Sequence, residues 1–183
     1  GLTVKIGDQS LSEASISGFQ QKLCFSDGVL SREYVAAFGQ KHLKVKISRF
    51  FSLYDVHIAA IRLEITPLDF EGEITVLATL DATSCNLPIQ DDQVKKNTET
   101  VRYVDTLALS ELEDGGLAVY KTRITGIQIV QAFNLVLPAS IVVLDKQRNS
   151  SAQGLDYQVT FLGKAGKTYI LDKLVTVFTS RDL

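Results

Sequence analysis

The chain has 183 residues, with 19 basic and 21 acidic side chains and a formal net charge of −2. Its apolar and charged fractions of 45% and 22% are those of an ordinary globular domain, which excludes disorder and collagen-like repeats. The near-neutral charge excludes the strongly basic surface of proteins that bind nucleic acid or anionic membranes. No apolar run approaches the ~20 residues of a membrane-spanning helix, and no signal segment opens the sequence. We therefore expect one domain, with no nucleic-acid or membrane partner.

Alternation of apolar and polar residues predicts strands along most of the chain. In chain order the alternating segments are 43–47, 61–65, 74–80, 127–137, 155–161 and 175–177. Their apolar residues stand two apart, which is the repeat of a strand with one buried face. Segment 52–61 has a spacing that also suits a helix, because Leu53, Val56, Ile58 and Ala59 are three or fewer residues apart. We expect a strand there as well, since alternating segments flank it on both sides.

Turn residues separate the predicted strands. Gly-containing segments at 26–28, 38–40, 70–72, 114–116 and 163–166 lie between apolar runs, where hairpins reverse. Two polar stretches, 90–99 and 146–154, are the best candidates for exposed loops, and we expect the first to be mobile. Helical periodicity is scarce. These patterns predict an all-β fold, a single β-sandwich of antiparallel sheets with roughly ten or more strands.

Little in the sequence indicates catalysis. Segment 163–168 ends like a phosphate-binding loop, but Phe161 stands where that motif needs its first glycine, so we expect a hairpin turn. Asp55 and His57 stand two residues apart and would share one strand face, where they could bind a metal or share a proton. With a single further histidine, His42, and no third ligand, a structural hydrogen bond is the favoured interpretation.

Arg49 would lie on the same face as this pair if the strand were unbroken, because all three positions are odd-numbered. We expect Arg49, Asp55 and His57 to form a buried or half-buried polar cluster that fixes a strand corner.

Carboxylates and thiols are the remaining candidates. Five acidic residues lie in or near predicted turns and loops: Asp69, Glu71, Glu73, Asp91 and Asp92. Glycosyl transfer needs two carboxyl groups at a defined separation, which sequence spacing does not establish, so we expect surface acids. The two cysteines, Cys24 and Cys85, lack a CxxC partner, which favours free thiols over a disulfide or a zinc site. We assign no catalytic, metal-binding or cofactor-binding residue.

Several segments resemble glycoside hydrolase family 65. Residues 48–62, Ser-Arg-Phe-Phe-Ser-Leu-Tyr-Asp-Val-His-Ile-Ala-Ala-Ile-Arg, resemble the family segment ERF-S-x-x-D-x-H-x-A-x-x-R. Residues 64–75 are similar to its TPLxFxGxI continuation, and residues 122–132 to its T-x-x-(S/T)-G-x-x-V-A-x-A strand. Residues 179–182, Thr-Ser-Arg-Asp, resemble the segment that closes its N-terminal domain. The departures are Cys24 and Phe25 in place of Asp-Met, Ala82 in place of Gly, and the missing Gly-Asn-Gly opening.

The resemblance implies a β-supersandwich (galactose mutarotase-like) of antiparallel sheets. In the family this domain precedes a helical linker and an (α/α)6 barrel that carries the catalytic Glu and the phosphate-binding residues. We therefore expect residues 1–183 to be a single β-sandwich domain, a fragment of a larger inverting phosphorylase or α-glucoside hydrolase. The resemblance further implies maltose, kojibiose, nigerose or trehalose together with phosphate as substrates of the parent enzyme, no cofactor, and a cytoplasmic location.

Two functions compete at this point. The first is a non-catalytic domain that supports its own catalytic barrel and contributes to a homodimer. The second is an autonomous carbohydrate-binding module. Such modules present a planar row of exposed aromatic side chains to the sugar. Here Trp is absent, and the Phe and Tyr residues mostly stand on predicted buried faces, which favours the first function.

Overall fold

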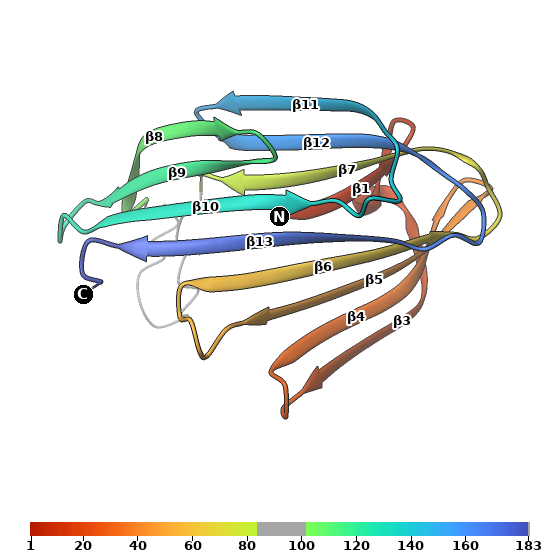
Figure 1. Cartoon of the computed structure of the whole chain (residues 1–183), viewed down its shortest axis with the longest axis horizontal. Helices are drawn as coiled ribbons and strands as arrows, with labels where there is room; N and C mark the ends of the chain where they lie inside the picture. Colours follow the sequence, from red (N-terminus) through yellow and green to blue (C-terminus); the bar gives the residue numbers. More distant parts are fainter. Residues whose placement is uncertain (84–101, 183) are drawn as a thin grey trace, which may run out of the picture.

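The computed structural model describes residues 1–83 and 102–182, and these form two antiparallel β-sheets (Figure 1). The smaller sheet has the strand order β11-β12-β7-β1-β2. Its strands are β1 (Leu2–Ile6), β2 (Gln9–Ser10), β7 (Gly72–Asp81), β11 (Val143–Ser151) and β12 (Gly154–Gly163). The larger sheet has the order β3-β4-β5-β6-β13-β10-β9-β8.

The strands of the larger sheet are β3 (Ser15–Cys24), β4 (Val29–Phe38), β5 (Lys41–Phe51), β6 (Ile58–Pro67), β8 (Val104–Leu112), β9 (Gly115–Thr122), β10 (Gln128–Val136) and β13 (Tyr169–Thr179). A short 3-10 turn, η1 (Leu11–Glu13), is the one helical element in the described ranges. None of the described segments forms a helix with the length and apolarity to cross a membrane. The expected all-β class with antiparallel sheets is confirmed.

The hydrophobic core lies between the two sheets. Along β12, Leu155, Tyr157, Val159 and Phe161 are all fully buried, as their alternation predicts. They pack with the buried face of β7 and with the inner residues of the larger sheet, which include Leu43, Val45, Leu63, Ile65, Phe133 and Leu135. The alternating segments therefore lie in strands, and most of their apolar residues belong to the core or pack against it.

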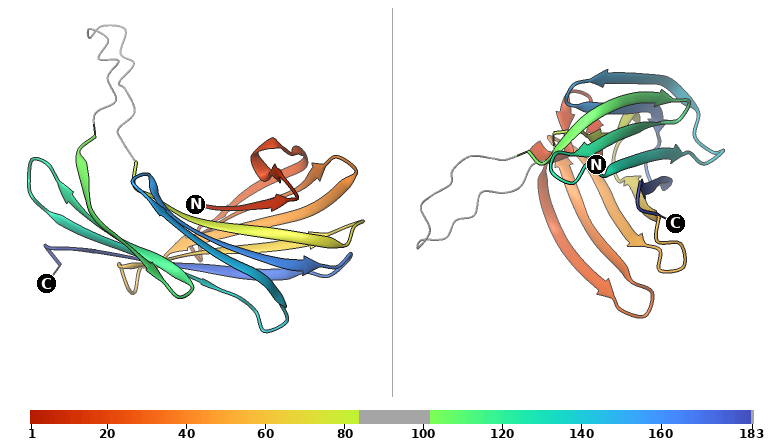
Figure 2. Two further views of the ribbon diagram at one scale, coloured as in Figure 1. Left: turned by 90° about the horizontal axis from the view of Figure 1, so that it is seen from above. Right: turned by 90° about the vertical axis from the view of Figure 1, so that its left-hand side faces the viewer.

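The larger sheet extends beyond the smaller one, so its inner face is open at one end (Figure 2). Side-chain burial therefore decreases along β5. Leu43 and Val45 are fully buried, and Ile47 and Arg49 are half-buried. Phe51, at the end of the strand, is 79% exposed. The same gradient runs along β13, where Leu171 is buried and Val177 is exposed. The expectation that Val177 belongs to a buried face is therefore wrong, because the smaller sheet does not reach it.

Two segment assignments also need correction. Residues 52–57 form the loop of the β5–β6 hairpin and not a continuous strand. Most of segment 146–154, expected as a loop, belongs to the exposed edge strand β11 and the start of β12. The predicted turns at 26–28 and 38–40 are confirmed, and Gly28 and Gly39 there have φ of 64° and 63°. The loop expected at 90–99 lies outside the described residues.

Candidate functional site

At the open end, the inner face of the larger sheet forms a groove of about 380 Å³. We call this the inner groove and define it by six lining residues: Arg49, Phe51, Ile61, Gln131, Lys173 and Val175. These six come from β5, β6, β10 and β13, four neighbouring strands of one sheet. Gly1 and the β7 residues Thr79, Leu80 and Asp81 line the groove on the side of the smaller sheet. The groove therefore has a rigid floor.

Strand register places two cations in one row across this floor. Arg49 pairs with Ile61 between β5 and β6, and Ile61 pairs with Lys173 between β6 and β13. Residues paired in register point to the same face, so Arg49 and Lys173 stand on either side of Ile61. Their backbones are two strands apart, about 10 Å at ordinary strand spacing.

Lys173 is the only charged residue among the described ones that is buried, with 4% exposure. Its Nζ donates to the backbone oxygens of Thr79 at 2.7 Å and Gly1 at 3.0 Å, and it lies 4.2 Å from the centroid of the Phe133 ring. Burial away from water lowers the pKa of Lys173 to about 8. Lys173 thus places a largely fixed positive charge at the inner end of the groove at neutral pH.

A second feature is apolar. Four side chains at the β5–β6 loop and the end of β13 are exposed and form what we call the tip surface: Leu53, Tyr54, Val56 and Phe178. Leu53 is 96% and Val56 79% exposed. The ring of His57 stacks on Phe178 with centroids 4.1 Å apart, which holds the loop against β13. Groups of exposed apolar side chains mark contact surfaces more often than isolated apolar residues do.

The loop itself is organised by Asp55, although not in the expected way. Its backbone N donates to the Ser52 hydroxyl at 2.9 Å, and its carboxylate accepts from the His57 backbone N at 3.0 Å. His57 Nδ1 lies 2.9 Å from the Val177 carbonyl oxygen. Within the described ranges, no hydrogen bond or ion pair joins Arg49 to Asp55 or His57. The expected three-residue cluster is wrong, because the strand ends at Phe51 and the loop turns the other two residues away.

The Thr-Ser-Arg-Asp segment forms the turn that ends β13. The Thr179 hydroxyl donates to Asp182 at 2.8 Å, and the Ser180 backbone N donates to the Gln128 carbonyl at 2.9 Å. These bonds fasten the turn to the start of β10. Asp182 also lies 3.7 Å from His57, so this turn adjoins the tip surface.

The outer face of the larger sheet is charged and internally paired. Ion pairs cross neighbouring strands between Lys44 and Glu33 at 2.7 Å, Lys46 and Glu64 at 2.8 Å, and Arg62 and Asp172 at 2.8 Å. We call these residues the outer ladder. Such a face is well suited to water, in contrast to the tip surface.

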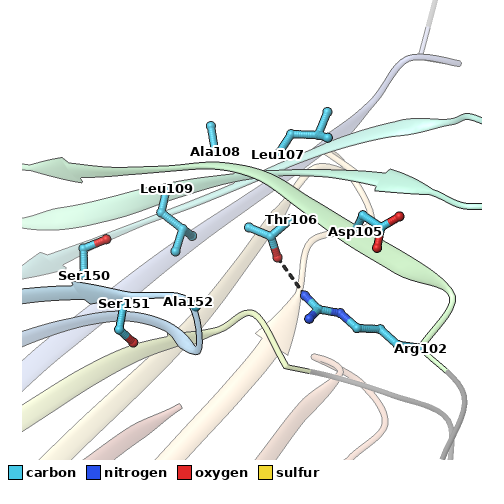
Figure 3. A pocket seen from close by; sticks show the side chains of 9 residues that line it. All are labelled: Arg102, Asp105, Thr106, Leu107, Ala108, Leu109, Ser150, Ser151 and Ala152. Atoms are coloured by element: carbon cyan, nitrogen blue, oxygen red, sulfur yellow. Dashed lines mark hydrogen bonds between the residues drawn. The ribbon is translucent and has the colours of Figure 1, made fainter.

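Another crevice, of about 590 Å³, lies between β8 and the β11–β12 hairpin (Figure 3). Its single cation, Arg102, donates to the carbonyl oxygens of Ala82 and Val104 and to the Thr106 hydroxyl. The remaining lining is made of small hydroxyl and aliphatic side chains and Asp105, which pairs with Arg123. Because Arg102 and Asp105 are already bonded to protein groups, the described lining of this crevice has no unpaired charge with which to bind a ligand.

The acidic residues named from the sequence that the structure describes are either hydrogen-bonded within the fold or exposed on its surface. Asp69 accepts from the backbone N of His42 at 2.8 Å and also contacts its ring, and these bonds lower the pKa of the Asp69 carboxyl. Glu71 and Glu73 are exposed just before and at the start of β7.

Segment 163–168 connects β12 to β13, so no helix follows it as a phosphate-binding loop requires. Cys24 has a free thiol, while Cys85, Asp91 and Asp92 lie outside the described residues. No group of three metal-ligating side chains occurs in the part of the chain described.

Sequence reasoning missed both the inner groove and the buried lysine. The signal for the lysine was present, since Lys173 stands in phase with Tyr169 and Leu171 on the buried face of β13. The groove could not be found in this way, because it depends on where the smaller sheet ends. The arrangement can bind a ligand, and it holds no pair of carboxylates in the groove for acid–base chemistry on a sugar.

Comparison with known proteins identifies the relatives of this chain. The kojibiose phosphorylase of Caldanaerobacter subterraneus subsp. tengcongensis is 28% identical over 184 residues, which cover 94% of this chain and 23% of that protein. The α,α-trehalose phosphorylase of Thermoanaerobacter brockii is 27% identical over 142 residues, covering 78% and 18% of the two chains. The chain spans less than a quarter of the length of the curated relatives it matches.

A solved structure provisionally described as a kojibiose phosphorylase from the human microbiome superposes with a TM-score of 0.76. Its identity is 16%, and the match covers 98% of this chain and 22% of that chain. This likeness confirms the β-supersandwich fold that the resemblance implied. The family model described as glycosyl hydrolase family 65, N-terminal domain, matches residues 1–183. The chain therefore belongs to glycosyl hydrolase family 65, as its N-terminal domain.

Proposed function

We propose that this chain is the non-catalytic N-terminal domain of a disaccharide phosphorylase and that it supports the catalytic barrel of the same polypeptide. The relatives are phosphorylases of kojibiose, trehalose and nigerose, and each is more than four times as long as its matched part. That proportion supports a position as one sandwich domain of a longer enzyme. The disaccharide and phosphate would then bind in the barrel.

The observation that carries the supporting role is the tip surface. Leu53, Tyr54 and Val56 stand almost wholly in solvent, beside the turn at which the chain leaves β13. Burying apolar area stabilises by about 25 cal/mol per Å², so a cluster of this kind contributes well to a domain contact. The outer ladder has its charges already paired and gains nothing from desolvation. We therefore propose that the barrel region contacts the tip surface and that the outer ladder stays in water.

The test uses the full-length protein with the double variant Leu53→Ser, Val56→Ser. We expect a lower melting temperature and weaker phosphorolysis of the cognate disaccharide. In the 183-residue chain the same substitutions should leave the melting temperature unchanged, because both side chains are already exposed. Lys44→Ser, in the outer ladder, is the matched control and should affect neither protein by much. A full-length double variant as stable and active as the parent would refute the docking role.

A contact between two copies has its own candidate, the edge strand β3. This ten-residue strand carries one charge, Lys22, and exposes Ile16, Phe19 and Leu23 by 50–56%. The edge strand β11 carries three charges and is better protected against pairing. We propose antiparallel β3–β3 pairing as the homodimer contact. Sedimentation should report a dimer that Phe19→Lys converts to a monomer, and an unchanged dimer would place the contact elsewhere.

Two finer points complete the proposal. We place the enzyme in the cytoplasm, which the free thiol of Cys24 supports, because reducing compartments preserve thiols. Fractionation of the native host tests this location.

We prefer phosphorolysis to hydrolysis because the relatives are described as phosphorylases. The two reactions release different products. Incubating the full-length protein with disaccharide should release a hexose 1-phosphate only when phosphate is added, whereas a hydrolase would release free sugar without it.

A further inference from the structure

We propose that the inner groove is a binding site for a hexose phosphate, whose phosphoryl group contacts Arg49 and whose ring lies on Ile61 and Phe51. The proposed function places the catalytic centre in the barrel, whereas the lining of this site consists of sandwich residues. The choice of a hexose phosphate among compact anions rests on that proposed function, because phosphorolysis joins a hexose to phosphate. The positions of Arg49, Lys173 and the apolar residues between them come from the structure and do not depend on the proposed function.

The charge of the groove is the first argument. Among the described residues, no ion pair joins a carboxylate to Arg49 or Lys173. Asp81 is the single carboxylate among the described residues of the groove lining, which also contains Gly1 with its terminal amine. Arg49 is half-buried and Lys173 is buried, so both charges are only partly solvated. Two under-compensated cations on one row of one sheet face favour an anion between them.

The two cations have different tasks. Lys173 already donates to the oxygens of Thr79 and Gly1, so it supplies positive potential from a fixed position. Arg49 makes no hydrogen bond to another described residue, so none of these residues fixes the direction of its guanidinium. The planar guanidinium matches two oxygens of a phosphate at once, which makes it the better direct contact.

The floor and the size of the groove describe the rest of the ligand. Ala59, Ile61 and Val175 form an apolar surface between the cations, and Phe51 exposes its ring on the same sheet face. A pyranose has an apolar C–H face that packs on such groups while its hydroxyls bond to polar ones, and Gln131 lies in the lining for this purpose. The volume of about 380 Å³ is at the small end of ligand pockets, which suits one sugar ring with a phosphate.

Burial of the groove by an apolar segment of the parent enzyme is the competing occupant. It would desolvate the half-buried Arg49 without a counter-charge, which costs several kcal/mol. The chemistry of the lining therefore favours a small anion. The experiment below would also detect a segment of the enzyme that covers the groove.

The experiment titrates the 183-residue chain with glucose 1-phosphate, inorganic phosphate and glucose by calorimetry, with amide NMR shifts to locate the site and to verify that each variant is folded. Glucose 1-phosphate should bind saturably and shift residues of β5, β6 and β13. Glucose alone and inorganic phosphate alone should each bind about tenfold more weakly or worse. Arg49→Gln should reduce the affinity by about tenfold or more, and Phe51→Ala by a smaller factor.

Arg62→Gln is the matched control, because Arg62 is next to Ile61 on β6 but faces the outer ladder, where it pairs with Asp172. It should leave the affinity unchanged. In the full-length protein, glucose 1-phosphate should occupy one site per chain beyond the catalytic one, and Arg49→Gln should remove that additional site while phosphorolysis remains.

Four results would overturn the proposal. One is no saturable binding by the chain, and another is equal losses from Arg49→Gln and Arg62→Gln. The third is binding by the chain that is absent from the full-length protein, which would mean that a segment of the enzyme covers the groove. Inorganic phosphate binding as tightly as glucose 1-phosphate would refute the sugar subsite. Because none of these readouts uses catalysis by the barrel, failure of the phosphorylase assignment would appear separately, as missing turnover.

Discussion

The ammonium of Lys173 lies 4.2 Å from the centroid of the Phe133 ring, between neighbouring strands of the larger sheet. The ring face and two backbone oxygens replace the water that a buried ammonium loses. This replacement is incomplete, since burial lowers the pKa of Lys173 from 10.5 to about 8. A cation at a position where alternation calls for an apolar residue therefore has a cost in stability.

That cost predicts an unusual dependence of stability on pH. The folded protein releases the Lys173 proton near pH 8, and the unfolded chain keeps it to about pH 10.5. Between these values the unfolded state binds more protons, so the free energy of unfolding should rise with pH, by about 2 kcal/mol from about pH 7.5 to about pH 9.5. Chemical denaturation at the two values measures the rise.

Lys173→Met serves as the control, since it lacks the titrating group and should lose most of this rise. Measurements should stop below pH 10, because burial raises the pKa of Tyr34, Tyr120 and Tyr157. These tyrosines keep their protons in the folded state at a pH where the unfolded chain loses them, which lowers stability. If the wild type and the methionine variant show the same slope, the ammonium is not desolvated as described.

Asp55→Ala tests the loop of the β5–β6 hairpin. The substitution removes the acceptor of the His57 backbone N–H, so we expect a loss of about 1 kcal/mol and a melting temperature lower by about 2–4 °C. Asp55→Asn retains an acceptor oxygen and should recover most of the loss. A melting temperature that does not change, together with loss of sugar binding, would show that Asp55 belongs to a site and not to the turn.

The two glycines that open β9 test the packing between strands and between sheets. A Cβ on Gly115 would lie 1.9 Å from the carbonyl oxygen of Phe133, and a Cβ on Gly116 would lie 2.4 Å from Leu155. Because the first obstacle is backbone, Gly115→Ala should cost about 3 kcal/mol or more. Gly116→Ala meets a fully buried leucine side chain, whose adjustment should keep the cost lower.

Gly39→Ala is the comparison for these variants. Its Cβ would meet no atom within 4 Å, and only the φ of 63° opposes the substitution. We expect a cost of about 1–2 kcal/mol. Urea denaturation of the three variants should rank Gly115→Ala as the least stable, and the reverse order would contradict the strand packing described.

The strands were predictable because period-two alternation depends on each strand alone. The series from Leu155 to Phe161 is buried without exception, as its pattern requires. The failures occur where burial depends on the partner sheet. Val177 continues a buried series but lies beyond the reach of the smaller sheet, and Asp55 follows a strand that ends at Phe51. The inner groove depends on the same boundary, so no local pattern in the sequence reveals it.

The last prediction is that the 183-residue chain alone catalyses no glycosyl transfer. An inverting reaction needs one acid to protonate the leaving oxygen and an activated phosphate or water on the opposite face of the sugar. Both must converge on one cleft. Asp81 is the single carboxylate among the described lining residues of the inner groove, and Glu73 stands exposed on β7 of the other sheet. Incubation with phosphate and maltose, kojibiose, nigerose or trehalose should therefore release neither glucose 1-phosphate nor glucose above background. Turnover that disappears on Glu73→Gln or Asp91→Asn would instead locate the reaction in this domain, and the supporting role would have to be abandoned.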